Sequence, residues 1–279
     1  MTTKRVTLRA PAKINWTLEV LGKRADGYHE IRSVMQTIDL ADEVSLGLAE
    51  QLALAVEDGE GLLNVAPEDN LALRAAARLR EHTGVDAGVN IRLRKHIPVA
   101  AGLGGGSSDA AAVLRGLCVL WQLDMPDEEL AELGAKLGSD VPFFIGGGTA
   151  LVSGRGEIVE QLPDVVTCRV AVACGLDARP DKTARMYAAL RPEHYTDGSR
   201  TEALAERIRR GEPVRDEDCF NVFEAVLAEV DPGAAAQFDS ARDSGYKPHV
   251  CGSGPAYFSL GRGASTMSAA EAVRISGRA

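Results

Sequence analysis

The chain has 279 residues and a mass of 29.5 kDa, enough for one large or two ordinary domains with a real hydrophobic core. Hydrophobic residues make up 45% and charged residues 25%, which are globular values and exclude a disordered chain. The formal net charge of −9 leaves no overall positive charge with which to hold nucleic acid or an anionic membrane. We therefore expect neither nucleic acid nor a membrane as a partner, although a locally basic pocket is compatible with this charge.

The N-terminus lacks the continuous apolar core of a signal peptide, and no later stretch approaches the ~20 apolar residues of a membrane span. The five cysteines form no CxxC pair, which fits neither a disulfide framework nor a zinc knuckle. The sequence therefore predicts a cytoplasmic protein whose cysteines are reduced and mostly buried.

Alternating apolar residues predict a series of strands at the start of the chain, over 6–10, 13–20, 31–40, 44–48 and 52–56. Because no helix separates these strands, we expect antiparallel pairing. Asp69 and Asn70 can cap a helix that starts at Leu71 and ends near Gly84. A further strand is expected over 89–94.

The middle of the chain predicts alternating helices and strands. We expect helices over 110–120 and 127–137, a strand-like segment over 139–144, and a hairpin with strands at 149–152 and 157–159. The pattern of predicted strands and helices changes near Pro163, which indicates two α+β domains, residues 1–162 and 163–279. In the second domain we expect strands at 169–173, 248–251 and 256–260, and helices near 182–190, 201–210, 218–230 and 233–243.

The most unusual segment is glycine-rich and runs into an Ala-rich helix. Exposed backbone N–H groups at a helix N-terminus form an anion site, and phosphate is its commonest occupant. A Walker A loop needs Lys where Ser107 stands, and a dinucleotide fingerprint needs a sixth-position glycine that is also absent. We therefore predict a phosphate site of another kind, formed by Pro98, Val99, Ala100, Ala101, Gly102, Leu103, Gly104, Gly105, Gly106, Ser107 and Ser108.

This glycine segment resembles the second motif of the GHMP kinases. Two further motifs of that superfamily occur in the expected order, at 11–15 (PAKIN) and 251–255 (CGSGP). The resemblance implies an ATP-binding domain similar to ribosomal protein S5, followed by a ferredoxin-like α/β sandwich. We also expect Mg²⁺ to accompany ATP, with the hydroxyl of Ser107 or Ser108 and water as ligands, and the chain to be a monomer or homodimer.

Within the superfamily, the segments 13–15 (KIN), 24–29 (RADGYH) and 138–144 (GSDVPFF) resemble the family that phosphorylates 4-diphosphocytidyl-2-C-methyl-D-erythritol in the non-mevalonate isoprenoid route. The implied reaction moves the γ-phosphoryl group of ATP to the 2-hydroxyl of the methylerythritol moiety. Such a hydroxyl needs a proton acceptor, and the phosphoryl group needs positive charge around it. The resemblance assigns these roles to Asp140 and Lys13 and brings them together in the fold.

The same resemblance implies a cytidine site. Tyr28 can stack on the pyrimidine while His29 hydrogen-bonds its edge, and Asn15 also contacts the substrate. A second stacking aromatic is expected from the C-terminal domain, where Thr183 and Tyr187 match the family's Ser-Thr-x-x-x-aromatic stretch. Lys182 stands where serine is usual, and residues 174–181 depart from the family pattern.

Gly252, Ser253 and Gly254 form a tight turn that should support the phosphate loop. Residues 220–224 (FNVFE) resemble a family helix, for which we predict a packing role. Without the resemblance, Asp140 could be a turn residue and Lys13 a solvated strand end. The alternative functions are a GHMP kinase for mevalonate, homoserine or a sugar, and a non-catalytic nucleotide-binding homologue.

Overall fold

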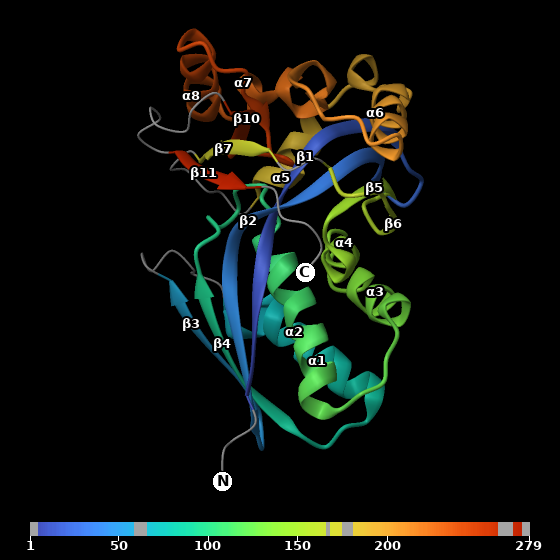
Figure 1. The fold of residues 1–279 in the computed structure, drawn as a ribbon, viewed down its shortest axis with the longest axis vertical. Helices are drawn as coiled ribbons and strands as arrows, with labels where there is room; N and C mark the ends of the chain where they lie inside the picture. Colours follow the sequence, from blue (N-terminus) through green and yellow to red (C-terminus); the bar gives the residue numbers. More distant parts are fainter. Residues whose placement is uncertain (1–4, 59–65, 166–167, 175–180, 262–269, 275–279) are drawn as a thin grey trace. The chain divides into compact units, whose positions relative to one another are not determined.

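The structure is a computed structural model that describes residues 5–58, 66–165, 168–174, 181–261 and 270–274 (Figure 1). Its described strands are β1 (Arg5–Lys23), β2 (His29–Ala49), β3 (Leu52–Asp58), β4 (Gly88–Lys95), β5 (Thr149–Gly154), β6 (Ile158–Gln161), β7 (Arg169–Ala173), β8 (Phe220–Asn221), β9 (His249–Val250), β10 (Tyr257–Leu260) and β11 (Ala270–Arg274). The first four predicted strands are thus parts of two long ones, since β1 continues through Pro11, and the fifth, at 52–56, is β3.

The described α-helices are α1 (Leu71–Thr83), α2 (Gly105–Trp121), α3 (Asp127–Ala135), α4 (Val141–Gly146), α5 (Lys182–Ala189), α6 (Ser199–Arg209), α7 (Leu227–Val230) and α8 (Pro232–Asp243). Short 3-10 helices occur at η1 (Pro67–Asp69), η2 (Pro192–His194), η3 (Asp216–Asp218) and η4 (Val222–Ala225). None of the helices in the described ranges is long and apolar enough to cross a membrane.

The chain divides into two compact units. The first unit comprises residues 1–12, 40–99 and 104–146, and the second comprises 13–39, 100–103 and 147–279. Each of the long strands β1 and β2 contributes one segment to either unit. The unit bounds differ from the expected boundary at residues 162/163, and that domain boundary stays a prediction.

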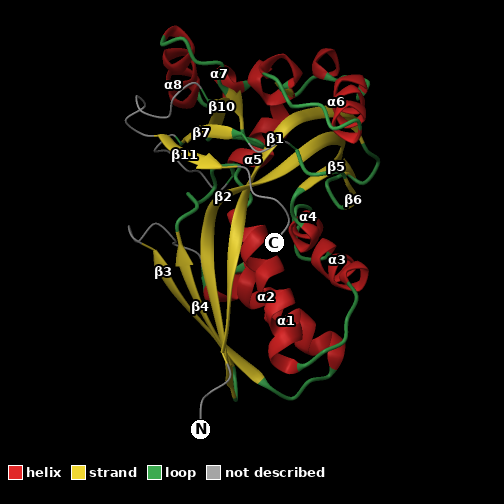
Figure 2. Ribbon diagram, viewed as in Figure 1, coloured by secondary structure: helices red, strands yellow, loops and turns green. Residues whose placement is uncertain are grey.

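In the first unit, β4 lies between β2 and β3. It pairs antiparallel with β2 and parallel with β3, so the expected antiparallel pairing is wrong for β3. The parallel pair is possible because α1 connects its two strands. Helices α1 and α2 lie side by side against this sheet (Figure 2). As expected, the Asn70 side chain caps α1 by accepting from the backbone N–H of Ala72, and Gly84 ends the helix in the left-handed conformation.

Two elements of the first unit differ from the expectation. Helix α2 begins at Gly105 rather than at 110, so Ser107, Ser108 and Asp109 lie inside its first turns instead of preceding the helix. The segment around Pro142 is the short helix α4, not a strand. Proline is accommodated there because the first turn of a helix does not need its missing N–H group.

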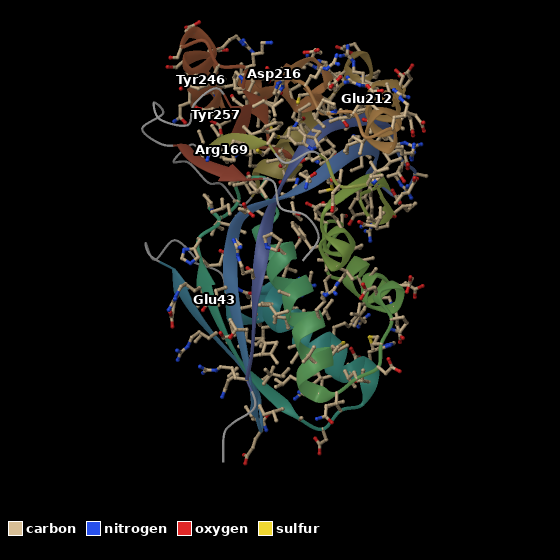
Figure 3. All side chains as sticks on the ribbon, in the orientation of Figure 1. Glu43, Arg169, Glu212, Asp216, Tyr246 and Tyr257 are labelled. Carbon is tan, nitrogen blue, oxygen red and sulfur yellow. The ribbon has the colours of Figure 1, made fainter. Side chains whose placement is uncertain are left out.

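In the second unit, β1 pairs with β8, while β2 pairs antiparallel with β5, and β5 with β6. A separate sheet has the strand order β11-β7-β10-β9, and Figure 3 labels Arg169 in β7 and Tyr257 in β10. The expected helix over 218–230 is instead η3, β8, η4 and α7, because Phe220 and Asn221 join the edge of β1.

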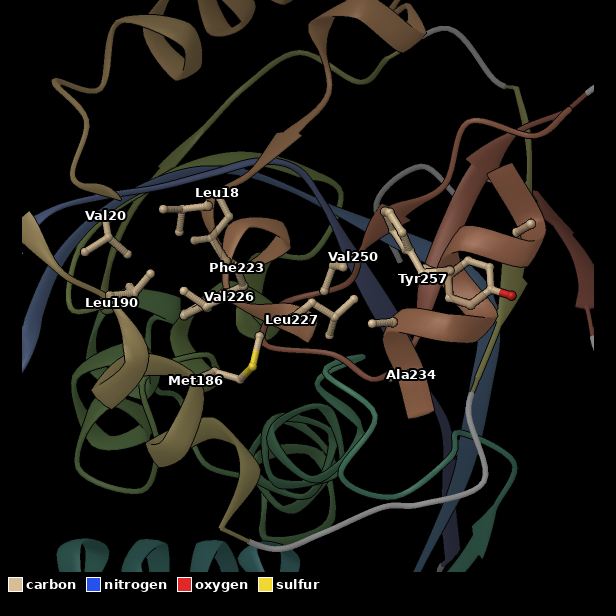
Figure 4. Close-up of a cluster of buried hydrophobic side chains, with 14 of the residues drawn as sticks. Leu18, Val20, Met186, Leu190, Phe223, Val226, Leu227, Ala234, Val250 and Tyr257 are labelled. Atoms are coloured by element: carbon tan, nitrogen blue, oxygen red, sulfur yellow. The ribbon is translucent and has the colours of Figure 1, made fainter. Parts of the chain in front are cut away.

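The core of the second unit gathers apolar side chains from both of its sheets and from α5, α7 and α8. Leu18 and Val20 of β1 pack there together with Met186 of α5 and Phe223 of η4 (Figure 4). This core fixes η4 against the end of β1. It therefore determines where the polar side chains of residues 221–224 lie.

Candidate active site

The predicted phosphate loop is distributed over both units. Pro98, Val99 and residues 104–108 belong to the first unit, while residues 100–103 belong to the second.

In the first unit, the loop ends in the first turn of α2. Gly104 caps this helix in the left-handed conformation without a side-chain hydrogen bond, and its carbonyl accepts from the Ser108 N–H at 3.0 Å. The first N–H groups of a 17-residue helix therefore lie beside the loop. This is the local geometry that an anion such as phosphate requires.

Gly105 and Gly106 face different surroundings. A Cβ on Gly105 would lie 3.1 Å from Ile97 Cγ2 and 3.3 Å from Lys95 Nζ, so this face of the turn is already packed. A Cβ on Gly106 would meet only Leu71 Cδ1, at 3.7 Å. A side chain that blocks the approach of phosphate would therefore have to be placed at Gly106, which is exposed, rather than at Gly105.

A buried ion cluster lies behind this turn, and the sequence analysis missed it. Lys95 Nζ donates to Asp109 Oδ2 at 2.7 Å and also to Asp42, whose Oδ1 accepts from the Ile97 N–H at 2.9 Å. Burial raises the pKa of the Asp109 carboxyl to about 7, against the opposing attraction of Lys95. The three residues are far apart in sequence, so only the strand pairing of β2 with β4 could have indicated the cluster.

The segment that carries Asp140 lies beside the phosphate loop within the first unit. A Cβ on Gly138 would lie 3.7 Å from the Ser107 Oγ, and Gly138 is two residues before Asp140. The backbone of Val141 turns back to the Gly138 carbonyl at 3.2 Å and starts α4. Asp140 is thus held at a turn next to the loop that is expected to bind ATP.

The hydroxyl of Ser108 fits the Mg²⁺ and phosphate chemistry implied for the loop. Its Oγ is buried and has no hydrogen-bond partner, although a buried hydroxyl normally has one. A phosphate oxygen or a hydrated Mg²⁺ would supply that partner. Among the described residues, no group of three or more His, Cys, Asp or Glu side chains could hold a metal by itself.

In the second unit, Lys13 lies in a buried hydrogen-bond network. Its side chain is 4% exposed, and Nζ donates to Asn15 Oδ1 at 2.8 Å. The same oxygen accepts from the Gly252 N–H at 3.0 Å. A Cβ on Gly252 would lie 3.0 Å from Lys13 Nζ and 2.8 Å from the Gly102 carbonyl oxygen, so only glycine fits there.

The glycine turn also contacts the part of the phosphate loop that belongs to this unit. A Cβ on Gly102 would lie 2.1 Å from the Cys251 carbonyl oxygen and 2.9 Å from the Gly254 nitrogen. The Ala256 N–H donates to the Ala101 carbonyl at 3.0 Å. Since Gly102 also has a positive φ of 84°, the contact requires glycine at this position.

The residues expected to bind cytidine form a group of their own in the second unit. The His29 and Tyr187 rings stack, with centroids 5.0 Å apart, although 158 positions separate them in the sequence. Tyr28 is 51% exposed and lies under the Arg155 guanidinium, 4.9 Å from the ring centroid. Burial lowers the pKa of the His29 imidazole, which favours the neutral ring. A neutral imidazole has one donor and one acceptor nitrogen with which to hydrogen-bond the edge of a nucleobase.

The start of α5 is held against the glycine turn. Thr183 Oγ1 lies 2.8 Å from Ser253 Oγ, so this expected substrate residue meets the third motif. Lys182, which replaces the usual serine, donates to Asp231 Oδ2 at 2.8 Å. Residues 175–180, part of the stretch that departs from the family pattern, lie outside the described residues.

The structure therefore brings Lys13 together with Asn15 and Gly252, His29 with Tyr187, and Thr183 with Ser253. Lys13 belongs to the second unit and Asp140 to the first. The expected approach of these two residues to each other stays a prediction.

Comparisons with known proteins define the class first. Residues 70–148 match the family described as GHMP kinases N terminal domain. A homoserine kinase structure from Cytophaga hutchinsonii is 17% identical with a TM-score of 0.73 and covers 100% of this chain and 96% of its own, which shows the fold alone. The predicted α+β GHMP kinase fold is confirmed.

Two more similar proteins identify the family within this superfamily. A 4-diphosphocytidyl-2-C-methyl-D-erythritol kinase from Dehalococcoides mccartyi is 41% identical over 257 residues, which are 91% of this chain and 89% of the relative. A crystal structure of 4-(cytidine 5'-diphospho)-2C-methyl-D-erythritol kinase is 32% identical, covers 98% of this chain and 100% of its own, and has a TM-score of 0.78. The chain belongs to the 4-diphosphocytidyl-2-C-methyl-D-erythritol kinase family, as its motifs predicted.

Proposed function

We propose that this chain transfers the γ-phosphoryl group of ATP to the 2-hydroxyl of 4-diphosphocytidyl-2-C-methyl-D-erythritol. The products are ADP and the 2-phosphate, an intermediate of the non-mevalonate route to isopentenyl diphosphate. The identity of 41% over 91% of the chain to a kinase named for this substrate carries the proposal. The enzyme acts in the cytoplasm as a monomer or homodimer.

The chemistry needs a cation near the transferring phosphoryl group. Lys13 supplies it, because its ammonium is buried and held by Asn15, so it cannot swing away into solvent. A preorganised charge stabilises the transition state without first having to reorient. Asn15 thereby also connects the cation to the glycine turn at Gly252.

Asp140 accepts the hydroxyl proton of the substrate. It follows Gly138, whose Cβ position is 3.7 Å from the Ser107 hydroxyl of the phosphate loop, so acceptor and nucleotide meet at one end of α2. Mg²⁺ bound with ATP neutralises charge on the transferring phosphoryl group, and Ser107 or Ser108 would hold it. The unpartnered Oγ of Ser108 favours Ser108 for this role.

The aromatic group of the second unit binds the cytosine. The exposed Tyr28 ring offers one face to the base, Tyr187 offers a second aromatic surface, and His29 binds the edge of the base. Thr183 contacts the substrate from the start of α5. Mevalonate or homoserine has no base for this group to bind, which favours the cytidylated substrate over the other GHMP kinase substrates.

A coupled ADP-release assay tests the function. The purified chain is given ATP, Mg²⁺ and one of three acceptors: the cytidylated substrate, uncytidylated methylerythritol phosphate, or mevalonate. We expect kcat/KM for the first to exceed that for either of the others by at least a hundredfold. A preference for mevalonate would favour the alternative within the superfamily. No ADP release with any of the three acceptors would favour a non-catalytic homologue.

A further inference from the structure

Residues 221–224 have a polar function beyond the packing role predicted from the sequence. Asn221 ends β8, and Glu224 lies three positions later in η4. The Phe223 side chain packs into the core, whereas the side chains of Asn221 and Glu224 both point to the backbone of one residue, Val250. Asn221 Nδ2 donates to the Val250 carbonyl at 2.7 Å, and Glu224 Oε1 accepts from the Val250 N–H at 3.1 Å.

These two side chains hydrogen-bond the backbone of Val250 at the edge of its sheet, as a neighbouring strand would. Val250 lies in β9 at the edge of its sheet, where β10 is the neighbour on one side. Val250 is buried, so an unpaired carbonyl or N–H on the side of β9 that faces away from β10 would be costly. Asn221 and Glu224 satisfy both groups and fix the backbone immediately before the glycine turn.

Asn221, unlike Glu224, also contacts the glycine turn itself. Its Nδ2 also donates to the Gly252 carbonyl at 2.9 Å, and its Oδ1 is fixed by the Phe223 N–H at 3.0 Å. The Gly252 N–H in turn donates to Asn15 Oδ1, which accepts from Lys13 Nζ. Both asparagines are at most 3% exposed, so water does not compete for these bonds.

We propose that Asn221 is a positioning residue for Lys13. It acts through the backbone of Gly252, whose carbonyl it binds and whose N–H, in the preceding peptide unit, donates to the amide oxygen of Asn15. The inference rests on the proposed function in that it assigns Lys13 the task of holding charge at the phosphoryl group. Loss of Asn221 would let the backbone at Gly252 rotate, and Asn15 would then lose one of the hydrogen bonds that fix its amide beside Lys13.

The test compares Asn221→Ala with Glu224→Gln. Glu224→Gln is the matched control, because its amide oxygen can still accept from the Val250 N–H and the residue makes none of the Gly252 contacts. We expect Asn221→Ala to lower kcat by about ten- to a hundredfold, the scale of an ångström-sized misplacement of a reacting group, with both KM values within threefold. Glu224→Gln should change kcat by less than threefold.

Lys13→Ala and the double variant Lys13→Ala/Asn221→Ala separate positioning from a purely structural effect. If Asn221 acts through Lys13, kcat of the double variant is no lower than that of Lys13→Ala alone, because removing Lys13 already removes the contribution that Asn221 makes through it. A structural effect would instead multiply the two rate reductions and overturn the proposal. So would a kcat for Asn221→Ala within threefold of wild type, measured at a temperature at which circular dichroism shows the variant folded.

A second readout needs no kinase activity. Acetylation of Lys13 by acetic anhydride, in which the Nζ amine displaces acetate and loses a proton, is followed by peptide mass spectrometry. It should be at least threefold faster in Asn221→Ala than in Glu224→Gln, because an Nζ that is less firmly held by Asn15 is more accessible to the reagent. Equal labelling rates would overturn the inference even if the wild-type enzyme turns out to use another substrate. Absence of activity on the cytidylated substrate, with faster labelling, would count against the proposed function only.

Discussion

The binding of nucleotide phosphates at the exposed face of the first turn of α2 can be tested by adding a single methyl group at Gly106. A Cβ there meets only Leu71 Cδ1 at an ordinary 3.7 Å, and the residue is helical, so Gly106→Ala is compatible with the fold. Alanine replaces glycine in a helix with a gain of about 0.5–1 kcal/mol. The free energy of unfolding should therefore stay equal or rise.

The same methyl group lies where the nucleotide phosphates must approach the backbone. Loss of one charge-assisted hydrogen bond costs about 1.5–3 kcal/mol, which corresponds to a ten- to hundredfold weaker affinity for ATP. The expected result is thus a variant that is as stable as wild type and binds ATP poorly. Isothermal titration calorimetry with Mg·ATP and thermal unfolding measure the two quantities on the same sample.

Two other glycines of α2 serve as controls. At Gly105 the added Cβ is 3.1 Å from Ile97 Cγ2, and at Gly116 it is 2.5 Å from Leu46 Cδ1 and 2.6 Å from Leu8 Cδ1. Both substitutions overpack and should lower stability by about 1–3 kcal/mol, and Gly116→Ala should leave ATP affinity near wild type. Unchanged ATP affinity in a folded Gly106→Ala protein would refute the placement of the phosphates at this turn.

Three further predictions concern the acceptor substrate. Asp140→Asn should lower kcat by about 10²–10⁴ with little change in KM, as steady-state kinetics will show, whereas a loss under tenfold would indicate that Asp140 only positions the hydroxyl. Tyr28→Ala should raise KM for the cytidylated substrate by about 5- to 150-fold, from ~1–3 kcal/mol of stacking, and leave KM for ATP unchanged; equal changes in both would contradict cytosine stacking. His29→Ala should reduce the preference for cytidine over uridine in a competition assay, since the neutral imidazole binds the edge where amine and carbonyl differ, and an unchanged preference would remove this role.

Local signals in the sequence predicted much of the fold. Asn70 and Gly84 bound α1 as their capping chemistry requires, and the strand at β4 follows from its alternating residues. The sequence predicts that α2 starts at 110, five residues later than it does, because glycine and serine are poor helix formers by propensity. The helix at α4 was read as a strand because a short apolar run has no period that separates the two.

The candidate site was predictable only where a motif carries the chemistry. The glycine loop is predicted from its own residues and the role of Lys13 from the resemblance to a family, whereas the stacking of His29 on Tyr187 depends on the tertiary fold. The ion cluster at Lys95 and the contacts of Asn221 had no sequence signal of their own, because each joins residues from separate elements. The packing role predicted for residues 220–224 follows from their resemblance to a family helix; Val222 and Phe223 are buried, whereas the Asn221 side chain binds backbone.

The position of the new phosphate on the product tests the central claim most directly. Phosphorus NMR of a completed reaction, with the cytidylated substrate labelled with ¹³C at carbon 2 of the methylerythritol moiety, identifies the oxygen that was phosphorylated. We predict one new phosphomonoester signal, coupled to carbon 2, with the diphosphate signals of the substrate intact and one ADP formed per phosphate transferred. A phosphate on another hydroxyl, cleavage of the diphosphate, or ADP formation with no new ester would contradict the account.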